Sequence, residues 1–218
     1  MSRINASLKI INSAKDIEKQ ILLALQEELT VRLRAAGRNL QNKLRKILSN
    51  AITSTPEYQS LLGGQLQSEL GVTNSRSRLS KIIDTFVNNV EIHINNIRIQ
   101  NHSISGGLDI NVVKYDYGEI LSLPESRYVT DKGVVIEWLQ WLLLEGDKII
   151  VRKYHIAHSK RRNNSRTGLG EIMVSGGRWR VPPEFSGKRD DNFITRAVEN
   201  AMNDIENAVK YELFNTGF

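Results

Sequence analysis

The sequence contains no cysteine, only four prolines in 218 residues, and few aromatic side chains. Without cysteine the chain can form neither a disulfide nor a thiolate metal site, and nothing in it indicates an oxidising compartment. The longest apolar run, WLQWLLL at 138–144, is far shorter than the ~20 residues that a membrane span needs. The first twenty residues hold no apolar core of signal-peptide length. We therefore expect a protein that is made and used in the cytoplasm of its cell, with no membrane partner.

Motifs for catalysis, metals and cofactors are also missing. The sequence contains neither the zinc-binding motif H-E-x-x-H nor the serine-nucleophile motif G-x-S-x-G. It also lacks the tripeptide Gly-Lys-Ser or Gly-Lys-Thr with which a phosphate-binding loop ends. Gly168-Leu169-Gly170 lacks the third glycine and the strand-to-helix setting of a dinucleotide fold. The acidic pair Asp190-Asp191 stands where a helix N-terminus attracts carboxylates. The four histidines show no metal-ligand spacing: His93, His102, His155 and His158. The sequence therefore predicts no enzyme, no metal and no cofactor.

The overall composition is that of a globular protein with a mild positive charge. Hydrophobic residues make up 40% of the chain and charged residues 25%, and the formal net charge is +6. This balance fits contact with nucleic acid or with an acidic partner. The same charges also suit the solvated face of a long helix, so the charge alone does not choose between these interpretations.

A long amphipathic helix is predicted for residues 13–52, which contain no proline and a single glycine, Gly37. Its apolar residues recur at spacings of three and four, the period of a helix with one apolar face. They are Ile17, Ile21, Leu25, Leu29, Leu33, Ala36, Leu40, Leu44, Ile47 and Ala51. Forty helical residues reach roughly 60 Å, which exceeds the width of a small domain. Such a helix needs partners along its length, either the rest of the fold or neighbouring copies.

Two shorter elements are predicted next. Thr55 and Pro56 are residue types of an N-cap and a first helical position, so a second helix should begin there. Gly63-Gly64 should interrupt it and Gly71 should end it. The following NSRSR, residues 74–78, is expected to be a polar connection. After it, LSKIIDTFVNNV is either another helix or the lead into a strand.

The remaining elements complete an α+β pattern. Residues 90–114 alternate as two antiparallel strands, 134–147 are predicted as a buried helix stopped by Gly146, and 148–158 alternate as a strand. EIMVSGGRWRVP at 171–182 follows as a second strand pair or a bent strand. Asp190 or Asp191 should cap a C-terminal helix. We therefore expect an α+β fold, with a helical arm at 1–54 and a core at 55–218. In it, a small, mostly antiparallel sheet packs with a tryptophan-containing helix and a C-terminal helix.

A basic loop, HSKRRNNSRTG at 158–168, is predicted between two strands. Lysine and arginine contact DNA phosphates without reading the base sequence. We call Lys160, Arg161, Arg162 and Arg166 the loop cations. They face DNA, an acidic neighbouring protein or plain water.

Three tryptophans and two arginines are candidates for an interface. Trp138 and Trp141 stand three apart on an apolar helix, which suits the core or an assembly surface. Trp179 lies between Arg178 and Arg180 on a strand, so it points one way and both arginines the other. A tryptophan-anchored contact with another chain would suit this arrangement.

Three segments resemble one known class of proteins. They are TSTPEYQSLLGGQLQSELGV at 53–72, GVVIEWLQWLLLEGDKIIV at 133–151 and SRTGLGEIMVSGGRWRVPPEFSGKRDDNFITRA at 165–197. In their order along the chain and in their residue patterns they are similar to neck and tail-completion structural proteins of tailed bacteriophages, including the lambda-like minor tail or tail-completion proteins. The resemblance covers much of residues 53–210. Members of this class combine a long helix with a small sheet.

The resemblance implies a virion protein without catalytic activity, assembled in the host cytoplasm. Such proteins form homo-oligomeric rings between head and tail, through which the genome passes. Their neighbours would be head-tail connector, tail terminator, tail tube or sheath proteins. A ring subunit needs two different surfaces that close by rotation, which the long helix and the tryptophan helix could supply. The resemblance does not separate tail completion from a tail terminator ring.

Two other hypotheses remain open. The first is a non-sequence-specific nucleic-acid-binding protein that acts through the loop cations and contacts genomic DNA. The second is an enzyme whose site follows no recognised pattern.

Overall fold

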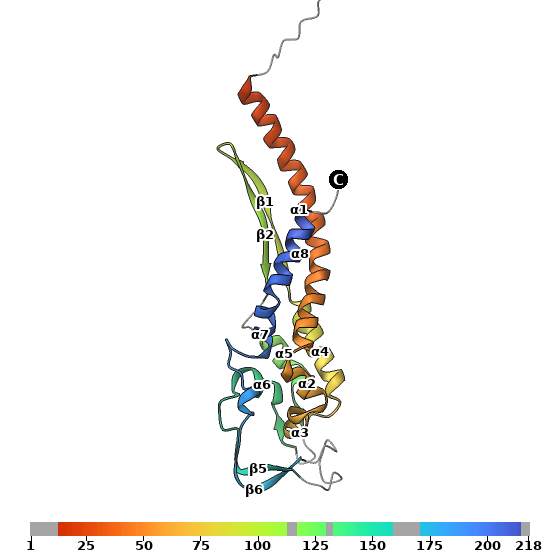
Figure 1. Cartoon of the computed structure of the whole chain (residues 1–218), viewed down its shortest axis with the longest axis vertical. Coiled ribbons are helices and arrows are strands. Elements are labelled where there is room, and N and C mark those ends of the chain that lie inside the picture. Colours follow the sequence, from red (N-terminus) through yellow and green to blue (C-terminus); the bar gives the residue numbers. More distant parts are fainter. Residues whose placement is uncertain (1–12, 113–116, 130–132, 159–170, 215–218) are drawn as a thin grey trace, which may run out of the picture.

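The computed structural model describes residues 13–112, 117–129, 133–158 and 171–214. Its elements are α1 (Ala14–Thr53), α2 (Pro56–Gly63), α3 (Gln65–Leu70), α4 (Ser75–Asn88), β1 (Glu91–Gln100), β2 (Ser103–Asn111), α5 (Gly118–Ser122), η1 (Pro124–Ser126), β3 (Tyr128–Val129), β4 (Val135–Ile136), α6 (Trp138–Leu144), β5 (Val151–His158), β6 (Glu171–Trp179), η3 (Pro183–Phe185), α7 (Phe193–Asn200) and α8 (Met202–Phe214). The molecule is elongated, with the start of α1 at one end and the β5–β6 ribbon at the other (Figure 1). The α+β fold that the sequence predicts is confirmed.

The long helix α1 begins at a capping box. The Ser13 hydroxyl accepts a hydrogen bond from the Asp16 backbone N–H, and the Asp16 carboxylate accepts from the Ser13 backbone N–H. Hydrogen bonds from the Ser13 side chain and then its backbone hold the pKa of Asp16 below its ordinary value. The buried residues of α1 all lie toward its C-terminal half: Leu33, Ala36, Gly37, Leu40, Leu44, Leu48 and Ile52. The predicted stripe therefore shifts by one residue near its end, since Leu48 and Ile52 are fully buried and Ile47 and Ala51 only partly.

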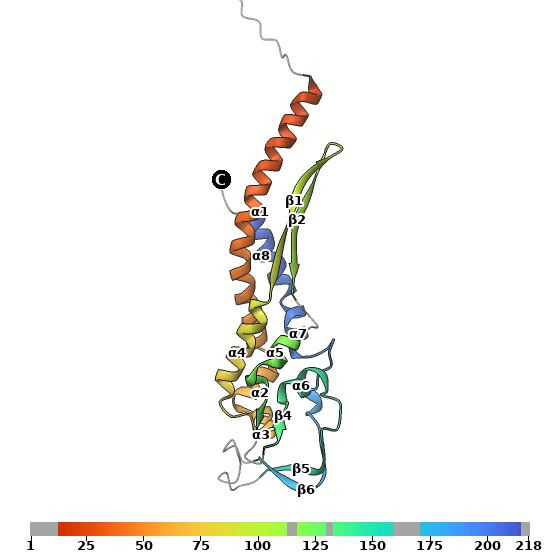
Figure 2. The ribbon, with the colours of Figure 1, turned by 180° about the vertical axis from the view of Figure 1, so that it is seen from behind.

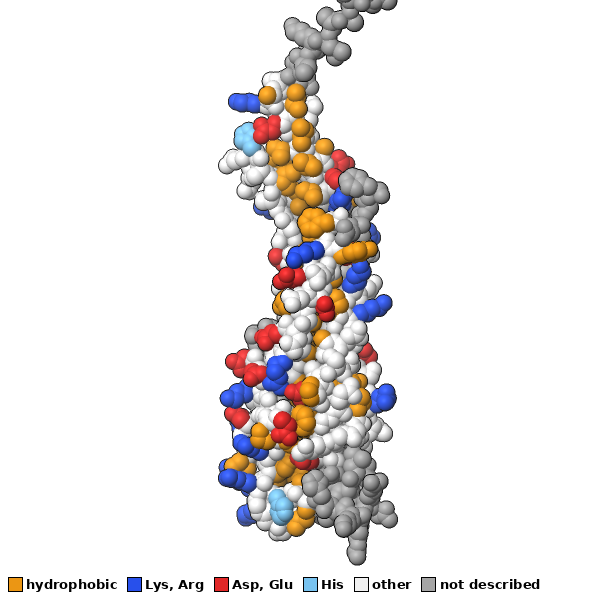
Figure 3. Space-filling view, in the orientation of Figure 1, with side chains coloured by type: hydrophobic (Ala, Val, Ile, Leu, Met, Phe, Trp, Pro, Cys, Tyr) orange, Lys and Arg blue, Asp and Glu red, His pale blue; other side chains and the backbone are white. Residues whose placement is uncertain are grey.

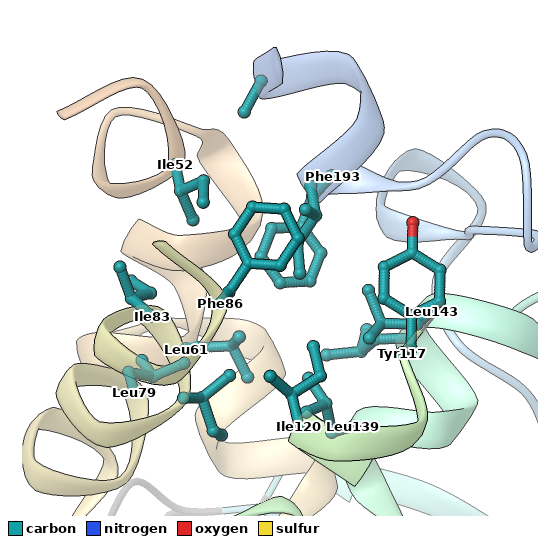
Figure 4. Close-up of a cluster of buried hydrophobic side chains, with 14 of the residues drawn as sticks. Ile52, Leu61, Leu79, Ile83, Phe86, Tyr117, Ile120, Leu139, Leu143 and Phe193 are labelled. Carbon is teal, nitrogen blue, oxygen red and sulfur yellow. The ribbon is translucent and has the colours of Figure 1, made fainter. Parts of the chain in front are cut away.

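The core lies around the C-terminal end of α1. Side chains from six parts of the chain meet there (Figure 4). Those labelled in the figure are all buried: Ile52, Leu61, Leu79, Ile83, Phe86, Tyr117, Ile120, Leu139, Leu143 and Phe193. Helices α2, α4, α5, α6 and α7 each contribute at least one of them, because each presents an apolar face to the end of α1. The N-terminal half of α1 extends beyond this core.

A buried ion pair ties α2 to α7. Glu57, in the first turn of α2, is 4% exposed, and its carboxylate accepts a hydrogen bond of 2.6 Å from Arg196 of α7. Arg196 also donates to Asp191 at 2.6 Å. Partial burial acts to lower the pKa of Arg196, but the hydrogen bonds to Glu57 and Asp191 outweigh it and raise that pKa above its ordinary value.

The predicted polar connection at 74–78 is wrong, because α4 begins at Ser75. Ser75 is buried and accepts a hydrogen bond of 2.9 Å from the Gln67 side chain. Arg78 donates to three backbone carbonyls near η1, those of Pro124, Glu125 and Arg127, at 3.2, 3.2 and 2.8 Å. These contacts with distant parts of the chain place a serine and an arginine inside a helix, where the local sequence suggests a loop.

The β1–β2 hairpin runs along the N-terminal half of α1, as two opposite views show (Figures 1 and 2). Near its base, Gly37 leaves room for Ile94, since a Cβ on Gly37 would lie only 3.0 Å from Ile94 Cδ1. Further along, the Gln26 side chain donates to the Ile97 carbonyl at 2.7 Å. At the turn, His102 Nδ1 lies 2.8 Å from a Glu18 carboxylate oxygen. The hairpin therefore braces one side of α1 over most of its exposed length.

The predicted small sheet is divided into three antiparallel ribbons in the described part of the chain: β1–β2, β3–β4 and β5–β6. The helix predicted at 134–147 is shorter than expected, since only Trp138–Leu144 is helical. Val135 and Ile136 instead pair with Val129 and Tyr128. Pairing with the short strand β3, which lies only a few residues earlier in the chain, overrides the apolar pattern that suggested one continuous helix.

Asn192, rather than Asp190 or Asp191, caps the C-terminal helical region. Its Oδ1 accepts hydrogen bonds from the backbone N–H groups of Ile194 and Thr195 at 3.1 and 3.2 Å. Its Nδ2 donates to Tyr117 Oη at 2.8 Å, to the Lys188 carbonyl at 2.9 Å and to the Leu143 carbonyl at 3.3 Å. An aspartate could cap but could not donate. The predicted single helix also breaks at Ala201, into α7 and α8.

Candidate functional site: an apolar ridge on the long helix

The N-terminal half of α1 exposes a row of large apolar side chains at a spacing of four residues. We call Ile17, Ile21, Leu25 and Leu29 the arm ridge. Their exposed fractions are 39%, 54%, 45% and 36%. The next residue in the same spacing, Leu33, is 6% exposed. One apolar pattern therefore changes from surface to core along a single helix.

The arm ridge continues a face of α1 that α8 covers lower down. Eighteen helical residues make five full turns, so Ile21 and Leu25 lie directly above Asn39 and Lys43. Both of these contact Glu212 of α8: Asn39 donates to its carboxylate at 3.3 Å, and Lys43 forms an ion pair with it. The Glu212 side chain is 2% exposed, so this contact anchors α8 firmly. The described part of α8 ends at Phe214, so no described part of α8 covers the ridge above it.

The end of α8 adds to the same apolar surface. Phe214 is 76% exposed and Tyr211 51%, although the Tyr211 ring lies 4.3 Å from the Lys43 ammonium. Figure 3 shows apolar side chains gathered along the N-terminal half of α1 and reaching down toward α8. Monomeric proteins rarely expose an apolar patch of more than a few hundred Å². The arrangement can bury apolar surface against another chain.

Reacting groups do not gather beside this surface. Within the described residues, no set of three or more His, Asp or Glu side chains could hold a metal ion. Neither does any described helix have the length and apolar character to cross a membrane. No family model, no curated protein and no solved structure matches this chain. The comparisons therefore assign no role to the arm ridge.

The structure places the predicted tryptophans in or beside the core. Trp138 is completely buried and donates from Nε1 to the Glu125 carbonyl at 3.1 Å, so it offers no surface to a partner. Trp179 is 8% exposed, while Arg178 and Arg180 are exposed, as the alternation predicts. Trp141 is half-buried and packs against Trp179, with ring centroids 6.1 Å apart. The two arginines are the most exposed members of this group, and Trp141 exposes part of its ring.

Trp179 attaches the β5–β6 ribbon to the rest of the protein, because its Nε1 donates to Glu69 of α3 at 2.9 Å. Replacing Trp179 by phenylalanine is expected to loosen the ribbon by about 1–2 kcal/mol, since the Glu69 carboxylate loses its partner and the ring pair loses area. Amide hydrogen exchange should accelerate in β5 and β6 and stay unchanged in α1. Trp141→Phe is the matched control, since it keeps the Glu69 bond. Equal acceleration in both variants would contradict the anchoring role.

The predicted basic loop lies outside the described residues, apart from the backbone of His158 at the end of β5. Lys160, Arg161, Arg162 and Arg166 are therefore left as a prediction. The sequence did not single out Arg152 and Lys153, which are exposed on β5 of the same ribbon. The missing information was that Arg152 pairs with Arg178 and that Lys153 lies at the register shift that follows, and both depend on the hairpin pairing rather than on any local pattern.

Proposed function

We propose that this protein is a structural subunit of the neck of a tailed phage. Copies of it would form a ring that joins the head-side connector to the tail and lets the genome pass. The observation that carries the self-assembly is the arm ridge. It is a row of leucine and isoleucine side chains continuous with a face that the protein's own α8 covers. The resemblance of residues 53–72, 133–151 and 165–197 to neck and tail-completion proteins supports the location.

A second copy of the chain is the occupant that best fits the ridge. The uncovered part of this face is about as long as α8, since Ile17 to Leu29 spans roughly 18 Å and the thirteen residues of α8 roughly 20 Å. A helix of a neighbouring copy could therefore continue the packing that α8 begins. The ridge and the helix that covers it would be different surfaces of the subunit. Repetition of such a head-to-tail contact gives a closed ring when the rotation between neighbouring subunits closes.

Mass photometry and negative-stain imaging of the purified full-length chain provide the test. The expected result is a closed ring of one discrete copy number, formed alone or on addition of a head-side connector. A strictly monomeric protein that joins neither connector nor tail tube would overturn the proposal. A tail terminator is the alternative assignment, and it would instead cap isolated tail tubes and ignore connectors.

A further inference from the structure

The β5–β6 ribbon and the residue that directly follows it carry four exposed cationic side chains. Arg152 and Arg178 are register partners and stand directly opposite each other, with Lys153 and Arg180 next to them. Nearby Lys148 and Lys188 pair with Glu145 and Asp147. In the described part of the chain, no carboxylate forms an ion pair with any of the four ribbon cations. We call Arg152, Lys153, Arg178 and Arg180 the ribbon cations.

This arrangement works against the stability of the isolated ribbon. Like charges directly opposite each other on paired strands are destabilising, and a two-stranded ribbon alone is marginally stable in water. Beyond the Trp179 anchor most of its described residues are exposed. A ribbon that keeps Arg152 facing Arg178 without an internal counter-charge is suited to a counter-charge from outside the molecule.

The geometry turns the cations outward. Val151 pairs with Trp179, which is buried, so the neighbouring Arg152–Arg178 pair lies on the opposite, outer face. The pairing then shifts between Arg152 and Tyr154, and Lys153 adopts a φ of 69°. Such bulges re-aim side chains. Figure 3 shows Lys and Arg side chains along one edge of this end of the molecule.

A hollow beside Arg178 of β6 and Arg180, which directly follows β6, completes the surface. It has a volume of about 410 Å³ and is lined by Asp147, Ile149, Arg178, Trp179 and Arg180. Arg178 and Arg180 are two residues apart, a distance of up to about 6.6 Å in an extended chain, so they can contact separate phosphate groups of a polyanion.

We propose that the β5–β6 ribbon binds the phosphate backbone of double-stranded DNA through Arg152, Lys153, Arg178 and Arg180, without reading the base sequence. The major groove of B-DNA, about 12 Å wide, admits a two-stranded ribbon. An acidic protein is the other polyanion that could meet these cations, and the test below separates it from DNA. The proposal does not rest on ring assembly, since a monomer would bind equally.

The test measures binding of the full-length protein to 30-base-pair duplexes of two unrelated sequences, by fluorescence anisotropy between 50 and 200 mM salt. Four phosphate contacts should weaken binding about 100-fold over this range, and equally for both sequences. Replacing all four ribbon cations by glutamine should lower the slope of log K against log salt by about 3–4. Arg152→Gln alone should lower it by about one.

The control removes four exposed cations elsewhere, with Arg34→Gln, Arg38→Gln, Lys46→Gln and Lys81→Gln, so that the net charge is the same. The control should keep the wild-type slope. Loss of binding in both variants alike, or no duplex binding by the wild type at 50 mM salt, overturns the proposal. Tighter binding of poly-L-glutamate than of the duplex also overturns it and makes an acidic protein the partner. Circular dichroism checks folding, which loss of the Arg152–Arg178 repulsion should not impair.

Discussion

A single Ile21→Glu substitution is expected to leave the protein folded and monomeric. Ile21 is the most exposed member of the arm ridge, at 54%, so glutamate is solvated in the free subunit. In the assembled state the carboxylate would be buried without a partner, which costs several kcal/mol. A cost of about 4 kcal/mol weakens each contact about 1000-fold. Mass photometry should show only subunits, while the thermal midpoint of the dissociated subunit stays within a few degrees of its wild-type value.

Leu23→Glu is the matched control. Leu23 is 48% exposed and lies on the same helix, but 200° around the axis from Ile21. It therefore introduces the same charge at the same height on the opposite side of α1. Rings that survive Leu23→Glu and vanish with Ile21→Glu would locate the contact on the ridge. Rings of the wild-type copy number with Ile21→Glu would rule out the ridge as the contact.

Asn192→Asp is expected to destabilise the protein by about 3 kcal/mol, although aspartate is as good an N-cap as asparagine. The reason is the donor group. Nδ2 of Asn192 donates to Tyr117 Oη, to the buried Leu143 carbonyl and to the partly buried Lys188 carbonyl, and Asn192 itself is completely buried. A carboxylate would place negative charge against the Leu143 and Lys188 carbonyl oxygens and remove the donor that Nδ2 supplies to each of them. The thermal midpoint should fall by about 10 °C in calorimetry or circular dichroism.

Asn42→Asp, at an exposed position in the middle of α1, provides the comparison and should change the midpoint by no more than a degree or two. Asn192→Ser keeps the capping acceptor without a charge and should lie between the two. The donor role fails if Asn192→Asp is as stable as the wild type, because capping alone would then account for the residue.

Elements with strong local signals were predictable from the sequence. Thr55 caps α2 with Pro56 at its first position, and Gly71 ends α3 in the left-handed conformation. The period of α1 gave its length to within a residue or two, because forty residues without proline hold a continuous apolar pattern. In each case the signal lies within a few residues of the structure that it determines.

Elements that depend on distant contacts were not predictable in this way. Arg78 belongs to a helix because carbonyls beyond residue 123 accept its hydrogen bonds, and Asn192 displaces two aspartates as the cap because it also has to donate. The candidate site shows the same limit. The apolar pattern of α1 was visible, but its change from exposed ridge to buried core depends on where the hairpin and α8 lie.

The contacts between α1 and the β1–β2 hairpin also couple the length of the helix to the length of the two strands. From Gly37 to Glu18 the helix rises by about 28 Å, and β1 covers about 20 Å from Ile94 to Gln100 before the turn that carries His102. The rise per residue differs between them, at about 1.5 Å in a helix and about 3.3 Å in a strand, so each residue added to a strand matches about two residues of helix. An insertion that lengthens this arm must therefore be coupled between the helix and both strands, and it must add whole turns to α1, because two added residues alone would turn the helix by about 200° and move its contacts to the other side.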